Sequence, residues 1–471
     1  MSLKKTIVKN ISLVAFSEVL SSILSYVLIV LVARLLGPEE LGIYSFTFAF
    51  AGIFTFLYDF GISYFYITKV SQDRANARKY FGQYASLKLV FCILTMIAPM
   101  VAILFTGQEK GVMLLVFLAA VSLFFQNYSY VARNTYYAYQ QMKYEAGVRI
   151  MERIIAFGLG VTVLLQGHGL FAFLVVLVLS NFFSVVLSIY FLRKLAVPFS
   201  LVVNVPTWKM MVRTSWPLWL STVFLTVYFQ VDTVMISFIQ GHEATGIYNA
   251  AYKLINVFSK IPWIIILVLF PVMAEAHAKM SKELLRGILE KGIQIMVLVG
   301  IPLVVGITAI AGNVISLVYG TGFSGAVLVL QILVWATAFL FLGNMAGWFF
   351  NSIGKPKVFT WVTGVCLSLN LALNLVLIPK FSYLGAAVAT VSTAFLNCVL
   401  LLWAIKKEGY SLTLFHLSVK PLFASLVMGV VAIALRDVLH VFLLVPIAMT
   451  VYVAVLIMVK GIRREDIEGM A

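Results

Sequence analysis

Long apolar runs, separated by short polar connectors, make up most of this chain. A run of about 18 residues or more lets an α-helix cross the hydrocarbon core of a bilayer, which is about 30 Å thick. We predict fourteen membrane-spanning helices, at residues 11–35, 40–67, 80–105, 111–138, 142–165, 169–193, 214–240, 245–274, 292–318, 325–352, 356–378, 383–405, 417–436 and 440–460. The first run is too long for a signal peptide and lacks a small-residue cleavage site, so we expect a retained helix.

The composition agrees with this pattern. Hydrophobic residues account for 62% of the chain and charged residues for 11%, and the mean hydropathy is +1.03. Soluble domains are about 25% charged. The sequence therefore predicts an all-α polytopic membrane protein with no soluble domain.

The net charge of +16 reflects topology rather than a nucleic-acid partner. If the N-terminus is cytosolic, 24 Lys and Arg residues fall in cytosolic segments and four in outer connectors, namely Arg34, Lys110, Lys380 and Arg436. Positive loops resist translocation. We therefore expect a protein of the cytoplasmic membrane with both termini in the cytosol.

A short connector occurs twice. "LLGPEELGIYSF" and "IQGHEATGIYNA" share G-x-E-x-x-G-I-Y, with Gly37 and Gly241 lying 204 positions apart. In each copy we expect the glycine to end a helix in a left-handed conformation. Six predicted helices separate the copies, and this even number indicates a parallel repeat about an axis along the membrane normal. Lys143 and Lys357, at the starts of spans 5 and 11, are a second pair of matching positions in the two halves.

The repeat predicts two six-helix lobes followed by two further helices. We expect an N-lobe of helices 1–6 at residues 1–194 and a cytosolic linker at 195–213. A C-lobe of helices 7–12 follows at 214–405, and helices 13–14 with a cytosolic tail occupy 406–471.

Three motifs resemble those of the Wzx-type polysaccharide flippases. They are R-x-L-G-P-x-x-x-G-x-Y after span 1, K-x-K-x after span 10, and L-I-P-K-F-x-Y-x-G-A-A at residues 377–387. That family belongs to the superfamily of lipid II flippases and multidrug/toxin extruders. The resemblance implies an alternating-access carrier of lipid-linked oligosaccharides, with helices 13 and 14 bordering a groove for the lipid tail.

Several charged residues fall within predicted spans of the N-lobe, at similar depths from the cytosolic end. They are Glu18, Asp59, Lys88, Arg133, Arg149, Glu152 and Arg153. A charge at the centre of a span costs about 2.5–3.5 kcal/mol on insertion scales, so each needs a partner or water. Glu145, Arg149 and Glu152 follow an i, i+4, i+7 stripe on one helix face. Two interpretations remain open: an internal ion-pair network, and a hydrated cavity whose Lys88, Arg133, Arg149 and Arg153 bind pyrophosphate.

The C-lobe carries a different set. Asp232, Asn370, Asn374 and Thr390 offer oxygen ligands suited to a monovalent cation, and resemble the sodium site of lipid II flippases, with Asn374 in place of an acid. Alternatively, Asp232 pairs with Lys253. Lys260, near the middle of span 8, is a further candidate for the substrate cavity.

No enzyme chemistry is indicated. Cys92, Cys366 and Cys398 lie inside predicted spans, the five histidines share no metal-ligand spacing, and no nucleophile–base pair or phosphate loop occurs. We expect no cofactor, with Na⁺ or H⁺ as the candidate coupling ion.

The expected function is the outward flipping of polyprenyl-pyrophosphate-linked oligosaccharides for surface glycan assembly. The expected partners are the bilayer and neighbouring glycan polymerases or glycosyltransferases, and we expect a monomer. The alternatives are a lipid II-type flippase, and a multidrug or cation antiporter, which should carry acids rather than arginines in its cavity. A membrane-embedded glycosyl- or acyltransferase would need a catalytic acid or histidine near the interface.

The charge asymmetry gives a direct test of topology. Cysteines introduced beside Lys282 or Lys407 should be shielded from impermeant thiol reagents in intact cells, whereas a cysteine beside Gln108 should react. Labelling near position 282 from outside would overturn the assignment.

Overall fold

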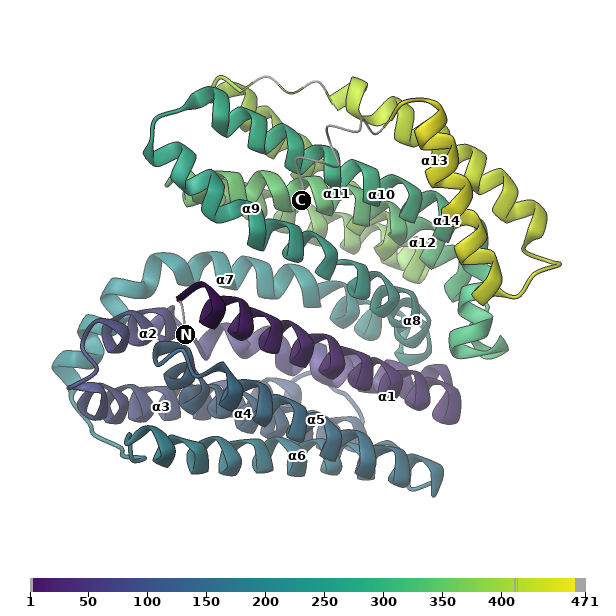
Figure 1. The fold of residues 1–471 in the computed structure, drawn as a ribbon. Coiled ribbons are helices and arrows are strands. Elements are labelled where there is room, and N and C mark those ends of the chain that lie inside the picture. Colours follow the sequence, from purple (N-terminus) through teal and green to yellow (C-terminus); the bar gives the residue numbers. More distant parts are fainter. Residues whose placement is uncertain (1–2, 411, 413, 462–471) are drawn as a thin grey trace. The chain divides into compact units, whose positions relative to one another are not determined.

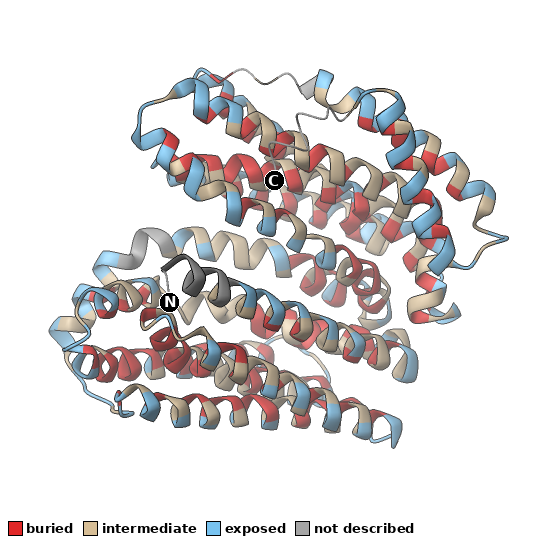
Figure 2. Ribbon diagram, viewed as in Figure 1, coloured by how far each residue is buried: buried red, intermediate tan, exposed pale blue. Residues whose placement is uncertain are grey.

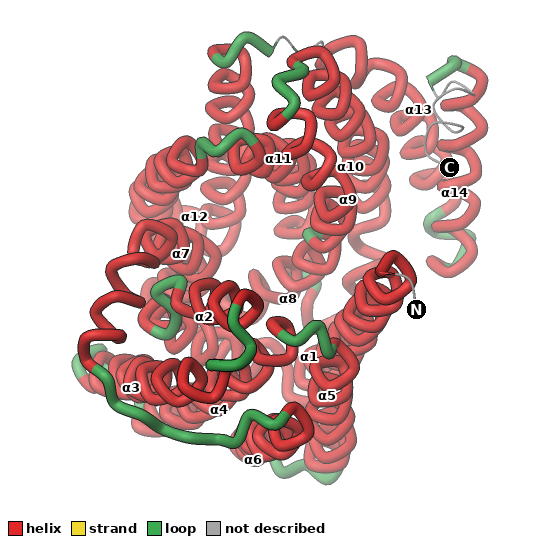
Figure 3. Tube along the Cα trace, turned by 60° about the vertical axis from the view of Figure 1, so that its left-hand side comes forward, coloured by secondary structure: helices red, strands yellow, loops and turns green. Residues whose placement is uncertain are grey.

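The computed structural model describes residues 3–410, 412 and 414–461, except for the side chains of residues 3–9, 11, 215–218, 414 and 415. The N-terminal lysines (Lys4, Lys5, Lys9) and most of the predicted cytosolic tail therefore lie outside the described side chains. Within the described part, all regular structure is helical (Figures 1 and 3). The elements are α1 Leu3–Ile53, η1 Phe54–Leu57, α2 Ile62–Gln72, α3 Ala77–Leu104, α4 Lys110–Ala138, α5 Met142–Leu165, α6 Gly169–Leu192, η2 Arg193–Leu195, α7 Val205–Gln240, α8 His242–Phe258, α9 Lys260–Ala278, α10 Lys282–Tyr319, η3 Thr321–Phe323, α11 Ala326–Ser352, α12 Pro356–Lys407, α13 Leu414–Leu435 and α14 Val441–Met458.

These helices account for the fourteen predicted spans. Among the described residues, 11 helical segments are long and apolar enough to cross a membrane. Two of them, at the α1 and α12 regions, contain sharp turns at Gly37 and Ser382 and so supply two spans each. The remaining span is α5, whose helix carries Glu145, Arg149, Glu152 and Arg153. The predicted all-α polytopic fold is confirmed.

The chain forms two compact units, residues 1–237 and 238–471. The boundary falls within α7, whereas the sequence placed the lobe boundary in a linker at 195–213. Helix α7 already begins at Val205, so the part of that linker without regular structure is shorter than expected. It packs on α3: Val202 N–H donates to Gly82 O (3.0 Å), and Ser86 Oγ donates to Val202 O (2.7 Å).

The repeated connector has the same backbone conformation in both copies. Gly37 has φ 87° and ψ −178°, and Gly241 has φ 88° and ψ −179°. This region is essentially restricted to glycine, and it is not the left-handed helical conformation that the sequence suggested. The two connectors are therefore equivalent turns, which supports the repeat.

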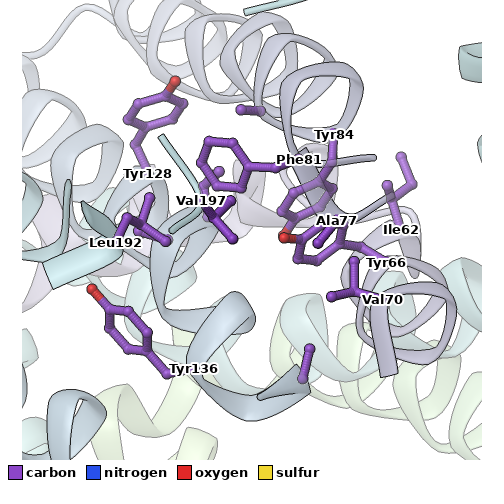
Figure 4. Close-up of a cluster of buried hydrophobic side chains, with 14 of the residues drawn as sticks. Ile62, Tyr66, Val70, Ala77, Phe81, Tyr84, Tyr128, Tyr136, Leu192 and Val197 are labelled. Atoms are coloured by element: carbon purple, nitrogen blue, oxygen red, sulfur yellow. The ribbon is translucent and has the colours of Figure 1, made fainter. Parts of the chain in front are cut away.

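Each unit has its own buried core, and large apolar side chains such as Trp361 and Val430 are exposed, as expected of helices in lipid (Figure 2). In the first unit, aromatic residues join α2 to α3 and α4 (Figure 4). The Tyr66 and Tyr84 rings stack with centroids 4.1 Å apart. Their hydroxyls bond to Thr135 Oγ1 (2.8 Å) and Asn134 Nδ2 (2.7 Å), so these buried polar groups are satisfied.

The helix that directly follows each repeated turn is interrupted. The first ends at Ile53, 16 residues after Gly37, and the chain continues through η1 and an irregular stretch to α2. The second, α8, ends at Phe258, 17 residues after Gly241, and α9 follows Ser259. The prediction of one continuous helix over 40–67 was therefore wrong. Pro262 accounts for the second interruption because it has no N–H to continue the helical bonding.

Side chains from neighbouring helices satisfy the irregular backbone of the first interruption. Lys88 on α3 is fully buried and donates to Tyr58 O (3.1 Å), while its Nζ lies 3.0 Å from Asp59 Oδ1. Its ammonium also lies 3.7 Å from the centroid of the Tyr58 ring. Trp219 on α7 donates to Phe56 O (2.8 Å). At membrane depth, irregular backbone persists only where it is satisfied within the protein or lines a water-filled cavity.

We predict that Lys88→Met strongly destabilises the protein, because it strands the Asp59 carboxylate. The loss should lie near the lower end of about 3–5 kcal/mol, since the Asp59 side chain is 29% exposed. Adding Asp59→Asn should restore part of it. The measurement is the denaturation midpoint of the purified protein in detergent.

The matched control is Lys279→Met, which breaks an exposed pair with Glu275 (2.6 Å) and should leave the midpoint almost unchanged, because exposed ion pairs add little to stability. Equal midpoints for the Lys88 and Lys279 variants would contradict the proposed role of Lys88.

Candidate functional site

The centre of the charged layer in the first unit is the Glu145 carboxylate on α5, which is fully buried. Arg133 on α4 approaches it with both arms of its guanidinium, Nε to Oε2 at 2.5 Å and Nη2 to Oε1 at 2.5 Å. Arg149, one turn along α5, donates from Nη2 to Oε1 (2.7 Å). Arg149 Nε also donates to Oε1 (3.3 Å), and the Tyr137 hydroxyl donates to the same oxygen (3.2 Å). Bidentate charge-assisted bonds of this kind are among the strongest in proteins.

A second buried carboxylate, Glu152, extends the network toward α6. Ser184 Oγ donates to Glu152 Oε2 (2.8 Å). Arg133 Nη1 lies 3.8 Å from Oε2, and Arg153 Nη2 lies 3.4 Å from Oε1. Arg133 also lies over the Tyr130 ring, 4.3 Å from its centroid. The guanidinium of Arg133 is therefore held by two carboxylates and an aromatic ring.

The network becomes more exposed toward α1. Arg149 forms an ion pair with Glu18 of α1, and their side chains are 16% and 46% exposed. Arg153 is 28% exposed, whereas Arg133 is 2% exposed. Arg149 is thus shared between a buried and an exposed carboxylate.

Charge in this layer is balanced. Its four cations are Lys88, Arg133, Arg149 and Arg153, and its four carboxylates are Asp59, Glu18, Glu145 and Glu152. The layer is therefore an ion-pair network rather than a positively charged surface. An anionic ligand that binds Arg133 or Arg149 through their paired nitrogens must therefore take the place of a carboxylate.

The sequence stripe along α5 was only partly informative. The i, i+4 pair of Glu145 and Arg149 is present. Glu152, at i+7, instead bonds across helices to Ser184 and approaches Arg133. The contributions of Tyr137 and Ser184 were missed, because spacing along one helix does not show which residues of a neighbouring helix face it.

The candidate cation ligands are divided between the two units. Asn370 and Asn374 are buried one turn apart on α12, and Asn374 Nδ2 donates to Asn370 Oδ1 (3.1 Å). Thr390 Oγ1 lies 3.3 Å from the Tyr248 hydroxyl. Asp232 is buried on the part of α7 that belongs to the first unit. The four residues are therefore not gathered within either unit, and both the cation site and the Asp232–Lys253 pair stay predictions.

Lys260 begins α9, directly after the interruption at Ser259, and its side chain is exposed. Asp59 lies in the corresponding interruption of the first unit. Interrupted helices at matching positions of two repeats commonly mark the substrate region of a transporter. Among the described residues, no group of three or more His, Cys, Asp or Glu could hold a metal ion.

Known proteins with similar sequences point to one family. The chain matches the polysaccharide biosynthesis protein family over residues 7–277, more than half of its length, and the lipid II flippase MurJ family over residues 209–454. It is 28% identical over 178 residues to an uncharacterized membrane protein of Methanocaldococcus jannaschii, covering 38% of this chain and 35% of that protein. It is 25% identical over 197 residues to the probable flippase AglR of Haloferax volcanii, covering 41% of each. The chain thus spans well under half the length of these curated relatives.

The fold has a close counterpart among solved structures. A lipid II flippase MurJ in an inward closed conformation superposes with a TM-score of 0.76 at 14% identity, covering 94% of this chain and 97% of that one. At this identity the likeness shows the fold alone. Together with the sequence matches it confirms the resemblance drawn from the three motifs: the chain belongs to the polysaccharide biosynthesis protein family, the Wzx-type flippases of the superfamily that also contains the lipid II flippases.

Proposed function

We propose that this protein flips polyprenyl-pyrophosphate-linked oligosaccharides from the inner to the outer leaflet of the cytoplasmic membrane. Family membership, and a relative named as a probable flippase, support this substrate class. The observation that carries the proposal at residue level is Arg149, which is held by buried Glu145 on one side and exposed Glu18 on the other.

In this proposal the pyrophosphate displaces the Glu18 carboxylate from Arg149. A guanidinium binds two oxygens of a phosphate at once, and Glu145 keeps Arg149 oriented while the exchange occurs. Because Glu18 is nearly half exposed, its displaced charge can be solvated. The incoming anion thus replaces one of the ion pairs already present and leaves no buried charge stranded.

The other cations contribute in different ways. Arg133 and Lys88 are buried and bonded to carboxylates, so we propose that they position Glu145 and the interrupted helix rather than touch the substrate. Arg153 is more exposed and remains a substrate-binding candidate. Lys260, at the interruption in the second unit, is the corresponding candidate there.

Membrane potential favours this direction of transport. With the cell interior negative, moving one negative charge outward is favoured by about 2.3 kcal/mol per 100 mV. A cation, Na⁺ or H⁺, could then reset the empty carrier. We further propose cytosolic termini, a monomeric carrier and delivery of substrate by neighbouring glycosyltransferases.

The rival functions fit less well. A multidrug extruder of organic cations should expose acids without matching arginines, whereas every carboxylate of this layer is matched by a cation. A lipid II-type flippase carries the same pyrophosphate group, so the residues of the layer do not separate it from the proposed function.

Replacing Arg149 with lysine should reduce transport by about 10-fold or more, because the second charge-assisted bond, worth about 1.5–3 kcal/mol, is lost. Transport would be measured in proteoliposomes as the arrival of lipid-linked sugar at a leaflet accessible to an impermeant oxidant. Membrane abundance should be unchanged.

The matched control is Arg286→Lys, which alters another i, i+4 Arg–Glu pair (3.0 Å to Glu290) outside the layer and should leave transport unchanged. If Arg149→Met combined with Glu145→Gln or Glu152→Gln restores transport, Arg149 is only an ion-pair partner, and the substrate role fails.

The proposed cation site predicts that sodium raises the thermal midpoint of the purified protein relative to a large inert cation at equal ionic strength. Saturation at 100 times Kd stabilises the folded state by about 2.7 kcal/mol. Asn374→Leu should abolish the sodium effect, and Lys253→Met should leave it intact. If instead Lys253→Met destabilises the protein and Asp232→Asn repairs it, Asp232 serves an ion pair. The absence of any sodium-specific shift would end the hypothesis.

A further inference from the structure

A small polar cavity lies within the first unit, among α1, α4, α5 and α6. Its volume is about 180 Å³, and Arg153 is the charged residue that lines it. Asn181, Ser180 and Ser122 line it as well, although all three are buried in apolar helices. Polar side chains at membrane depth are costly unless they bind one another, water or a ligand.

One wall of the cavity is aromatic. Tyr44 and Phe48 on α1 have ring centroids 5.0 Å apart, and Phe173 on α6 lies 6.0 Å from Tyr44. All three rings line the cavity. The wall offers flat apolar surface beside the guanidinium of Arg153.

The other wall offers planar hydrogen-bonding groups. Asn181 Nδ2 donates to Ser122 Oγ (2.8 Å), which orients its amide oxygen. Gln126 on α4 lines the cavity, and within the described part of the protein its side-chain amide makes no hydrogen bond. An amide brings two donors and an acceptor. Gln126 is therefore available to a bound molecule.

We propose that this cavity binds one pyranose ring of the transported oligosaccharide. A sugar ring has an apolar C–H face that packs on aromatic rings, and hydroxyls around its edge that bond to amides and guanidinium groups. A lipid chain would leave the amides unsatisfied, and an organic cation would be repelled by Arg153. A bare anion would not use the aromatic wall and would meet Glu152, 3.4 Å from Arg153. The volume lies below the 300–1,000 Å³ usual for drug-sized ligands and suits a single ring.

The position of the cavity indicates which sugar of the oligosaccharide binds there. Resting on the proposed function, pyrophosphate lies at Arg149, and Arg153 is one helical turn further along the same face of α5, a rise of about 6 Å. Under the predicted topology Arg153 is the deeper of the two. Because the lipid tail anchors the phosphates, the sugar directly attached to them should enter this cavity. On the facing helix, Glu18, Ser21, Ser22 and Ser25 form a polar i, i+3, i+4, i+7 stripe that leads from Arg149 to the cavity.

The test compares short-chain polyprenyl pyrophosphates that carry no sugar with those that carry N-acetylglucosamine, galactose or glucuronic acid. Binding is measured on the purified full-length protein in detergent. At least one sugar-bearing probe should bind about 10-fold tighter than the bare pyrophosphate, a difference of about 1.4 kcal/mol. Gln126→Leu should abolish this ratio of affinities between sugar-bearing and bare probes without changing the affinity for bare pyrophosphate. The control Gln331→Leu alters a glutamine of α11 outside the cavity and should keep the ratio.

A second readout does not depend on pyrophosphate binding. A cysteine introduced by Gln126→Cys should be alkylated by a small thiol reagent, and the methyl glycoside of the preferred sugar should protect it. The proposal is overturned if no sugar-bearing probe exceeds the bare pyrophosphate, or if the glycosides give no protection. If the glycosides protect the cysteine from alkylation but Arg149→Lys changes the affinity for none of the pyrophosphate probes, the proposed pyrophosphate site fails while the sugar cavity stands.

Discussion

The structure of the first unit depends on the matching of buried charge around Glu145. Its carboxylate receives donors from α4 and from its own helix, and Arg133 continues the contact to Glu152, which bonds to α6. In a low-dielectric interior, removing one partner of such a set leaves an uncompensated charge and costs more than the pair contributes. The ion pairs therefore fix how α4, α5 and α6 pack against one another. In a lipid bilayer this matters because apolar helix faces gain little by packing on one another rather than on lipid.

The two units share a backbone plan but not the side chains that produce it. Gly37 and Gly241 adopt the same conformation, and the helix after each turn is interrupted at nearly the same position. In the first unit Lys88 and Trp219 satisfy the freed carbonyls, whereas in the second Pro262 removes a donor. The two interruptions therefore share a position but not a form: the first includes an irregular stretch at residues 58–61, whereas the second is confined to Ser259.

Hydropathy was sufficient to predict the fourteen spans, and the repeated glycine turn to predict two related halves. Most of the intramembrane charges that the sequence singled out in the first unit form ion pairs with one another. Partners across helices could not be predicted, because Arg133 and Glu145 are 12 residues apart on different helices and nothing in their spacing shows that they meet. The interruption near Asp59 was missed because the run from 40 to 67 stays apolar on both sides of it, and the left-handed Gly61 was its main local signal. The four proposed cation ligands belong to different units, Asp232 to the first and the other three to the second, so the cation site stays a prediction.

A charge-balanced layer constrains how an anion carrier can work. An anion that binds Arg133 or Arg149 must displace a carboxylate, and the four carboxylates are not equivalent. Glu145 and Glu152 are buried and join helices, and Asp59 is bonded to Lys88 at the interrupted backbone, so displacing any of these would disturb the fold. Glu18 alone among the four is both close to a shared guanidinium and nearly half exposed, so it is the carboxylate that the protein encloses least. The same network can therefore stabilise the empty protein and present one arginine to a phosphate, because the exchange removes the most exposed ion pair and leaves every buried one in place.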